Sequence, residues 1–208
     1  MTIPTHTPAK KPFAVPTQAL QEAIEKEWST GKKFSPGTMP LTSLVYTAID
    51  QIDEKENIVE VLLAYIDTDT LSYRSANASL LAEQKKQWDP VLVWAGSKFN
   101  ALWQTTTGVM PLDQPEALHA AIKEYLLALD AMRLAACCSL ASGYSSLVLA
   151  IAVMEKHLSA ARAYDLSRLE EEAQAAQWGR DEEADERSRR MQAEIVETGH
   201  FLRLLEAA

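Results

Sequence analysis

The run Leu147-Val-Leu-Ala-Ile-Ala-Val-Met154 is the longest apolar stretch of the chain and the one that most restricts its fold. It is far shorter than the roughly 20 residues that a membrane-spanning helix needs. We therefore interpret it as a helix buried in the core of a soluble protein, and we expect no membrane insertion.

Length and charge narrow the class of protein. The chain has 208 residues, enough for one large domain or two small ones with a hydrophobic core. Its formal net charge is −9. A nucleic-acid-binding protein needs a basic face to neutralise phosphates, so the charge argues against that class. The acidic excess is concentrated in residues 165–190, which fits either solvated helix faces or a partner with a basic or polar surface.

Helical spacing of apolar residues extends over most of the chain. It predicts helices that begin after Thr17, at Pro40 and at Asn57, and then over residues 79–88, 90–99, 115–142, 144–157, 159–179 and 182–205. Two segments differ from this pattern. The Thr- and Tyr-rich segment 67–74 is predicted as a strand, and residues 102–109 as a short strand or loop.

A shift in composition near residues 75–79 marks a domain boundary. We expect a mainly α protein with a small α+β N-terminal domain over residues 1–75 and a helical domain over residues 76–208.

Common catalytic and metal-binding motifs are absent from the sequence. There is no glycine-rich phosphate loop and no Gly-x-Ser-x-Gly elbow. The cysteines, Cys137 and Cys138, are adjacent, so we expect free thiols rather than a strained disulfide. The four histidines are scattered without zinc-ligand spacing. We expect no cofactor, no metal and no small-molecule substrate.

Two groups of residues have a structural and a functional interpretation. Asp67, Asp69 and Arg74 form either the charged site of a small enzyme or, in the simpler interpretation, helix caps and an oriented arginine. Trp88 and Trp94 are expected to fill the core near a junction between two helices, and the Asp89-Pro90 pair to cap the second helix.

The stretch from Leu166 to Gly179 carries Glu170, Glu171 and Glu172, followed by Gln177 and Trp178. At about 100° per residue the three carboxylates point in different directions around a helix, so they form neither an acid/base pair nor a metal site. Composition alone leaves two alternatives, a solvated helix face or a semi-polar surface of the kind found at protein interfaces.

Six blocks occur together in a consistent order. They are Thr7-Pro-Ala-Lys-Lys-Pro-Phe-Ala-Val-Pro16, Met39-Pro-Leu-Thr42 with Thr47-Ala-Ile-Asp50, Asp67-Thr-Asp-Thr-Leu-Ser-Tyr-Arg74, Gln87-Trp-Asp-Pro90 with Trp94, Gly108-Val-Met-Pro111, and Leu166-Ser-Arg-Leu-Glu-Glu-Glu172 through Gln177-Trp-Gly179. This series resembles the assembly chaperones for the alpha subunit of the ATP synthase catalytic head, found in mitochondria and alphaproteobacteria.

The resemblance implies a mixed N-terminal domain with a small sheet, followed by an orthogonal helical bundle. Because only six residues precede the first block, we expect an abbreviated sheet. The absence of a transit peptide favours the bacterial cytoplasm over the mitochondrial matrix.

The resemblance also implies a non-enzymatic chaperone whose partner is the alpha subunit of ATP synthase. It favours a partner-binding role for Glu170, Glu171, Glu172, Gln177 and Trp178, and we expect Glu170 to contribute more than Glu171. The alternatives are a general helical scaffold or a small enzyme with an Asp/Arg site.

Overall fold

The computed structural model describes residues 3–52, 54–108 and 110–207, and over these residues the chain is helical. Its elements there are α1 (Gln18–Ser29), α2 (Pro40–Asp50), α3 (Lys55–Thr68), the 3₁₀ helix η1 (Thr70–Ser72), α4 (Ala78–Phe99), α5 (Glu116–Ala128), α6 (Ala131–Tyr144), α7 (Leu147–Met154), α8 (Ala160–Ser167), α9 (Leu169–Trp178) and α10 (Glu182–Leu204). None of the helices in these ranges is both long and apolar enough to cross a bilayer.

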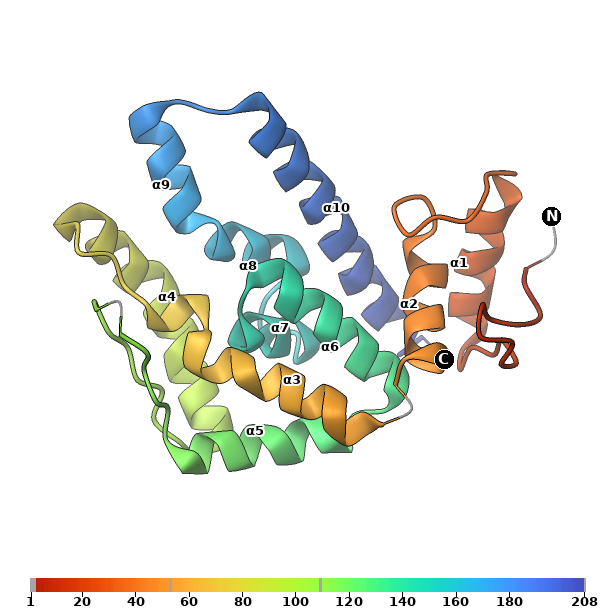
Figure 1. Ribbon diagram of the computed structural model, residues 1–208, viewed down its shortest axis with the longest axis horizontal. Coiled ribbons are helices and arrows are strands. Elements are labelled where there is room, and N and C mark those ends of the chain that lie inside the picture. The colour runs from red at the N-terminus through yellow and green to blue at the C-terminus, as the bar shows by residue number, and fades with distance from the viewer. Residues whose placement is uncertain (1–2, 53, 109, 208) are drawn as a thin grey trace.

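Helices α6, α7 and α8 lie at the centre of the molecule, with the other helices around them (Figure 1). Helices α1 and α2 form one end, and both chain termini lie near it (Figure 1). Helices α9 and α10 are joined by a turn that lies away from the central helices, and α10 then runs back to α2 (Figure 1). The two helices therefore form a hairpin with a projecting tip.

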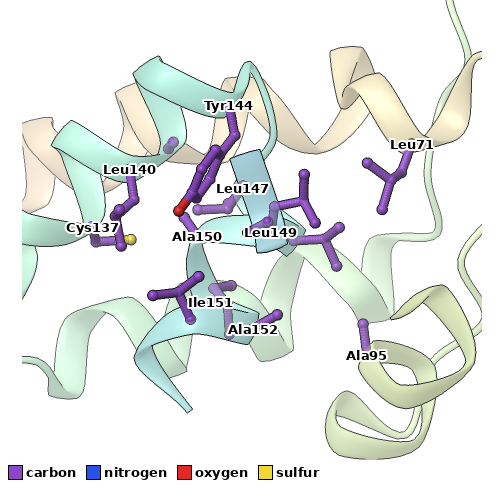
Figure 2. Close-up of a cluster of buried hydrophobic side chains, with 14 of the residues drawn as sticks. Leu71, Ala95, Cys137, Leu140, Tyr144, Leu147, Leu149, Ala150, Ile151 and Ala152 are labelled. Carbon is purple, nitrogen blue, oxygen red and sulfur yellow. The ribbon is translucent and has the colours of Figure 1, made fainter. Parts of the chain in front are cut away.

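The apolar run is the buried centre of the larger core, as the sequence predicts. Every residue from Leu147 to Val153 is less than 9% exposed. Figure 2 shows the run beside buried side chains of α4, α6 and η1, and buried residues of α3 belong to the same core. The first backbone amides of α7 find acceptors in polar side chains, because Leu149 N donates to Ser146 Oγ (3.1 Å) and Val148 N donates to Asp69 Oδ2 (3.1 Å). These caps replace hydrogen bonds that a helix cannot make at its own start.

A smaller core joins α1 and α2 to α6 and the end of α10. Beside this core, α1 and α2 are also joined by hydrogen bonds, since the Glu27 carboxylate of α1 accepts from the amides of Leu41 (2.8 Å) and Thr42 (3.0 Å) at the start of α2. The extended segment before α1 is attached to the end of α2, where Thr7 Oγ1 donates to Asp50 Oδ1 (2.5 Å). Blocks that are distant in the sequence thus contact one another.

The predicted α+β character of the N-terminal domain is wrong. In the described residues there is no sheet, abbreviated or complete, and the β-type pairings are two isolated bridges, His6 with Pro12 and Tyr73 with Thr106. The segment predicted as a strand, 67–74, instead contains the last turn of α3 and η1. Asp69 accounts for the difference, because its side chain accepts from Leu71 N (3.0 Å) and holds a turn.

Several predicted helix boundaries are also wrong. Helix α4 continues through Pro90, so Asp89 lies inside a helix and does not cap one. The proline removes one backbone donor, but the buried side chains on both sides of it stabilise the continuous helix. The helix predicted over 115–142 is divided where Asp130 caps α6 by accepting from Arg133 N (2.9 Å). Residues 102–108 form a loop apart from the bridge at Thr106, and Val109 lies outside the described residues.

The residues of the two cores can be compared with the predicted domain boundary near residue 75. Residues 59–71 contribute to the larger core, together with α4 to α8. Leu202 of α10 packs against both cores. The division into domains 1–75 and 76–208 stays a prediction.

Candidate functional site

Helix α9 is the least buried helix of the molecule. It is separated from α8 by Arg168, whose φ of −99° and ψ of 7° interrupt the helix predicted over residues 159–179. No residue of α9 is fully buried, and only Leu169, at its start, packs against the larger core. Ala176, two turns further along, is exposed because α9 leaves the body of the molecule (Figure 1). Nearly all of α9 is therefore available for contact.

The junction between α8 and α9 is anchored by Trp88 of α4. Its indole ring is fully buried, and Nε1 donates to the carbonyl oxygen of Leu166 (2.9 Å). The core role predicted for Trp88 is confirmed. Trp94 is half-buried and stacks on His157 with ring centroids 4.5 Å apart. The start of α9 is thus fixed, whereas its end is not packed.

The three glutamates of α9 have different electrostatic environments. Glu171 pairs with Arg168 (3.0 Å), and Glu172 pairs with Arg180 (2.5 Å), which raises the pKa of Arg180. Within the part of the chain that the structure describes, the Glu170 side chain makes neither a hydrogen bond nor an ion pair. Glu171 and Glu172 line one groove beside α9 and Glu170 lines another. Glu170 is therefore the one of the three whose charge no basic side chain of the described residues offsets.

Two grooves lie along α9. The α9–α10 groove, with a volume of about 610 Å³, contains Glu171, Glu172 and Arg168. The α4–α9 groove, of about 620 Å³, contains Glu170 and Gln177 on the opposite side of α9. Trp178 lines both and is 74% exposed. Gly179, with a φ of 96°, ends α9 directly after this tryptophan, as the sequence predicts.

The residues of the possible Asp/Arg site do not form one cluster. Asp67 accepts from the amide of Gln114 (2.9 Å) and lies 3.0 Å from His119 Nε2. Arg74 is buried and pairs instead with Asp89 of α4 (2.7 Å between Nη2 and Oδ1). Burial lowers the pKa of Arg74, and the Asp89 carboxylate opposes this effect.

Asp69 is also separate, since it caps α7 in the core. It is fully buried, and burial raises its pKa to about 6, although hydrogen bonds from Val148, Leu71 and Ser146 oppose the shift. Asp67, Asp69 and Arg74 thus each have a different structural role, in line with the simpler interpretation of the sequence.

The cysteines and possible metal ligands give no further site. Cys137 is buried and Cys138 half-buried, and both are free thiols, as expected. Burial raises the pKa of Cys138 to about 11, so its reactive thiolate is scarce at neutral pH. In residues 3–52, 54–108 and 110–207, no three His, Cys, Asp or Glu side chains are grouped so as to hold a metal ion.

Sequence reasoning missed the contribution of α4. Ser79, Leu80 and Glu83 form the wall of the α4–α9 groove opposite α9. No local pattern brings α4 and α9, about 90 residues apart, side by side. Sequence reasoning also missed that Arg168 pairs with Glu171 and Arg180 with Glu172. The spacing of Arg168 and Glu171 at i and i+3 would have indicated the first of these pairs.

Comparisons with known proteins agree on one family. The family model "ATP12 chaperone protein" matches residues 3–96. Mitochondrial protein atp12 from Schizosaccharomyces pombe is 29% identical over 195 residues, covering 86% of this chain and 67% of that protein.

Two crystal structures are more similar still. The structure of Atp12 from Paracoccus denitrificans has a TM-score of 0.90 and 34% identity, covering 96% of this chain and 87% of that chain. For the Atu1473 protein from Agrobacterium tumefaciens the TM-score is 0.87 and the identity 36%, covering 97% of this chain and 75% of that chain. Because the same helical fold and more than 30% identity extend over nearly its full length, the chain belongs to the ATP12 chaperone family.

Proposed function

We propose that this chain binds the unassembled alpha subunit of the F-type ATP synthase catalytic head and promotes its assembly with the beta subunit. The proposal rests on membership of the ATP12 family, whose members are chaperones of alpha-subunit assembly and not enzymes.

The physical purpose of such a chaperone follows from the assembly of alternating subunits. A newly made alpha subunit exposes surface that a beta subunit will later cover, and exposed apolar surface promotes aggregation. The chaperone covers this surface and is released as the ring of subunits forms. Such an activity needs neither a nucleotide, a metal nor a small-molecule substrate.

The contact surface is assigned to α9. The observation that supports it most is that α9 has no fully buried residue and ends in Trp178, whose side chain is 74% exposed. Large exposed aromatic residues beside polar ones are typical of protein interfaces. Glu170 and Gln177 lie on the same side of α9 and contribute an uncompensated charge and an amide. Glu171 and Glu172 contribute less, because arginines already pair with them.

The bacterial cytoplasm is the proposed location of this interaction. The chain is 34% and 36% identical to two bacterial structures, and 29% identical to the mitochondrial protein of fission yeast. The higher identity to the bacterial proteins supports the bacterial cytoplasm over the mitochondrial matrix.

A pull-down from the cell that makes this protein tests the proposal. We expect tagged chain to recover the ATP synthase alpha subunit as its main partner, and a Trp178→Ser variant to recover less of it. Recovery of many unrelated proteins would favour the general scaffold instead. Recovery of no ATP synthase subunit would contradict the proposal.

A further inference from the structure

The side chains that line the α4–α9 groove carry an excess of negative charge. Of the described residues that line it, Glu83 and Glu170 are charged and none is a lysine or arginine. Glu83 lies 3.9 Å from Lys86 across exposed surface, a separation that gives little stabilisation, and it accepts a hydrogen bond from the uncharged Gln87 side chain (2.6 Å). The Glu170 side chain has no partner among the described residues. The α9–α10 groove, by contrast, contains Arg168 and Arg187 among its acidic residues.

Apolar side chains line the same groove as these two carboxylates. Leu80 from α4 and Leu169 and Ala173 from α9 are half-buried there, and Trp178 is exposed. The surface complementary to such a groove is apolar along its centre and basic along its edges. An amphipathic segment with Lys or Arg beside its apolar stripe has this character.

The backbone of the groove favours a helix as the occupant. Most of the lining belongs to the helices α4 and α9, and the first amides of α4 are capped, since Ser79 N and Leu80 N donate to Asn77 Oδ1 (3.0 and 3.1 Å). The groove therefore offers no strand edge to an extended segment. An extended segment would leave its own backbone groups unpaired against the apolar floor, at a cost in free energy. A helix satisfies them internally. The groove volume of about 620 Å³ accommodates the side chains of one helix face.

We propose that the α4–α9 groove binds a basic amphipathic helix of the alpha subunit, with apolar side chains against Leu80, Leu169 and Trp178 and Lys or Arg near Glu83 and Glu170. This inference rests on the proposed function. It adds α4 to the contact surface and specifies the chemistry of the segment that the chaperone holds.

A pair of matched variants on α4 tests the groove. Ser79 is exposed in the groove, and Ser97 is exposed on the same helix 18 residues, or five turns, further along and outside it. Ser79→Arg places a bulky cation in the groove that Glu170 also lines, so we expect the Kd for purified alpha subunit to rise at least about tenfold, from steric exclusion and like-charge repulsion. Ser97→Arg should change the Kd by less than about twofold. Urea unfolding midpoints equal to that of wild type would show that both variants are folded.

Cross-linking identifies the occupant. Benzoylphenylalanine is placed at position 79 or 97, and each chaperone is irradiated with co-expressed alpha subunit. We expect position 79 to cross-link to one alpha-subunit helix with Lys or Arg at helical spacing, and position 97 to give no specific product.

Two outcomes would overturn the inference and leave the proposed function intact. The first is wild-type binding with equal effects of Ser79→Arg and Ser97→Arg. The second is a cross-link from position 79 to an acidic or extended segment. If wild-type chain does not bind the alpha subunit, the proposed function itself is wrong.

Discussion

The indole nitrogen of Trp88 lies 2.9 Å from the carbonyl oxygen of Leu166 and donates a hydrogen bond to it in the core of the protein. Leu166 lies in the last turn of α8, where carbonyls lack partners within an ideal helix. The bond therefore joins α4 to the residue that precedes α9 by three positions. The groove between α4 and α9 depends on this attachment.

Replacing Trp88 by phenylalanine should destabilise the fold. Trp88→Phe keeps most of the ring but leaves the buried Leu166 carbonyl without its donor, so we expect a loss of ~1–3 kcal/mol in the free energy of unfolding, measured with urea. Trp178→Phe is the matched control, because that ring is exposed and should change stability by no more than ~0.5 kcal/mol. Equal effects of the two variants would show that the bond to Leu166 contributes nothing.

Asp69 should make stability depend on pH. Its pKa is raised to about 6 in the folded protein from an ordinary value of 3.8, so the folded state binds more protons than the unfolded state between these values. The contribution of Asp69 to the free energy of unfolding should therefore be greatest below about pH 4. It should fall by on the order of 2–3 kcal/mol as the pH rises to about 6.

The Asp69→Asn variant separates this effect from those of other groups. Asn does not titrate, so the loss of stability between pH 4 and 6 should be smaller in the variant than in wild type. The variant itself should be less stable at every pH, because an amide nitrogen cannot accept the hydrogen bond from Val148 N. Parallel pH profiles of the unfolding free energy for the two proteins would rule out Asp69 as the source.

Gly199 lies where α10 packs tightly against α8. A Cβ at this position would lie 2.7 Å from the Cβ of Ala160, which cannot rotate away. Gly199→Ala should therefore destabilise the protein by about 1–3 kcal/mol through overpacking, in spite of the better helix propensity of alanine. Gly37→Ala, where the added Cβ has no neighbour within 4 Å, is the control and should be nearly neutral in the same thermal or urea unfolding measurement.

Local patterns predicted the parts of the fold in which one interaction dominates. The apolar run 147–154 was correctly predicted as a buried helix, because burying that many apolar side chains outweighs other preferences. The helices predicted to begin after Thr17 and near residue 159 are capped by the hydroxyls of Thr17 and Ser159, each of which needs only to lie beside the first amides of its own helix.

The incorrect predictions concern residues whose conformation depends on distant partners. Pro90 does not end a helix, because Trp88 and Val91 pack on the core on both sides of it. The segment 67–74 is not a strand, because Asp69 binds the start of α7, nearly 80 residues away. In the same way, the sequence indicated α9 as a candidate surface but not which glutamates are neutralised, since Arg180 reaches Glu172 across the turn that follows α9.

We propose that α9 of this chain holds the unassembled alpha subunit, with Glu170 contributing more than Glu171. The soluble yield of alpha subunit tests this when it is co-expressed with wild-type chain, with Glu170→Gln or with Glu171→Gln, because glutamine preserves shape and removes charge. Since an exposed ion pair is worth up to ~1 kcal/mol, Glu170→Gln should lower the yield about twofold to fivefold, and Glu171→Gln should leave it nearly unchanged. If both variants keep the wild-type yield and the stability of the chaperone, the acidic surface of α9 is only solvated and the account is contradicted.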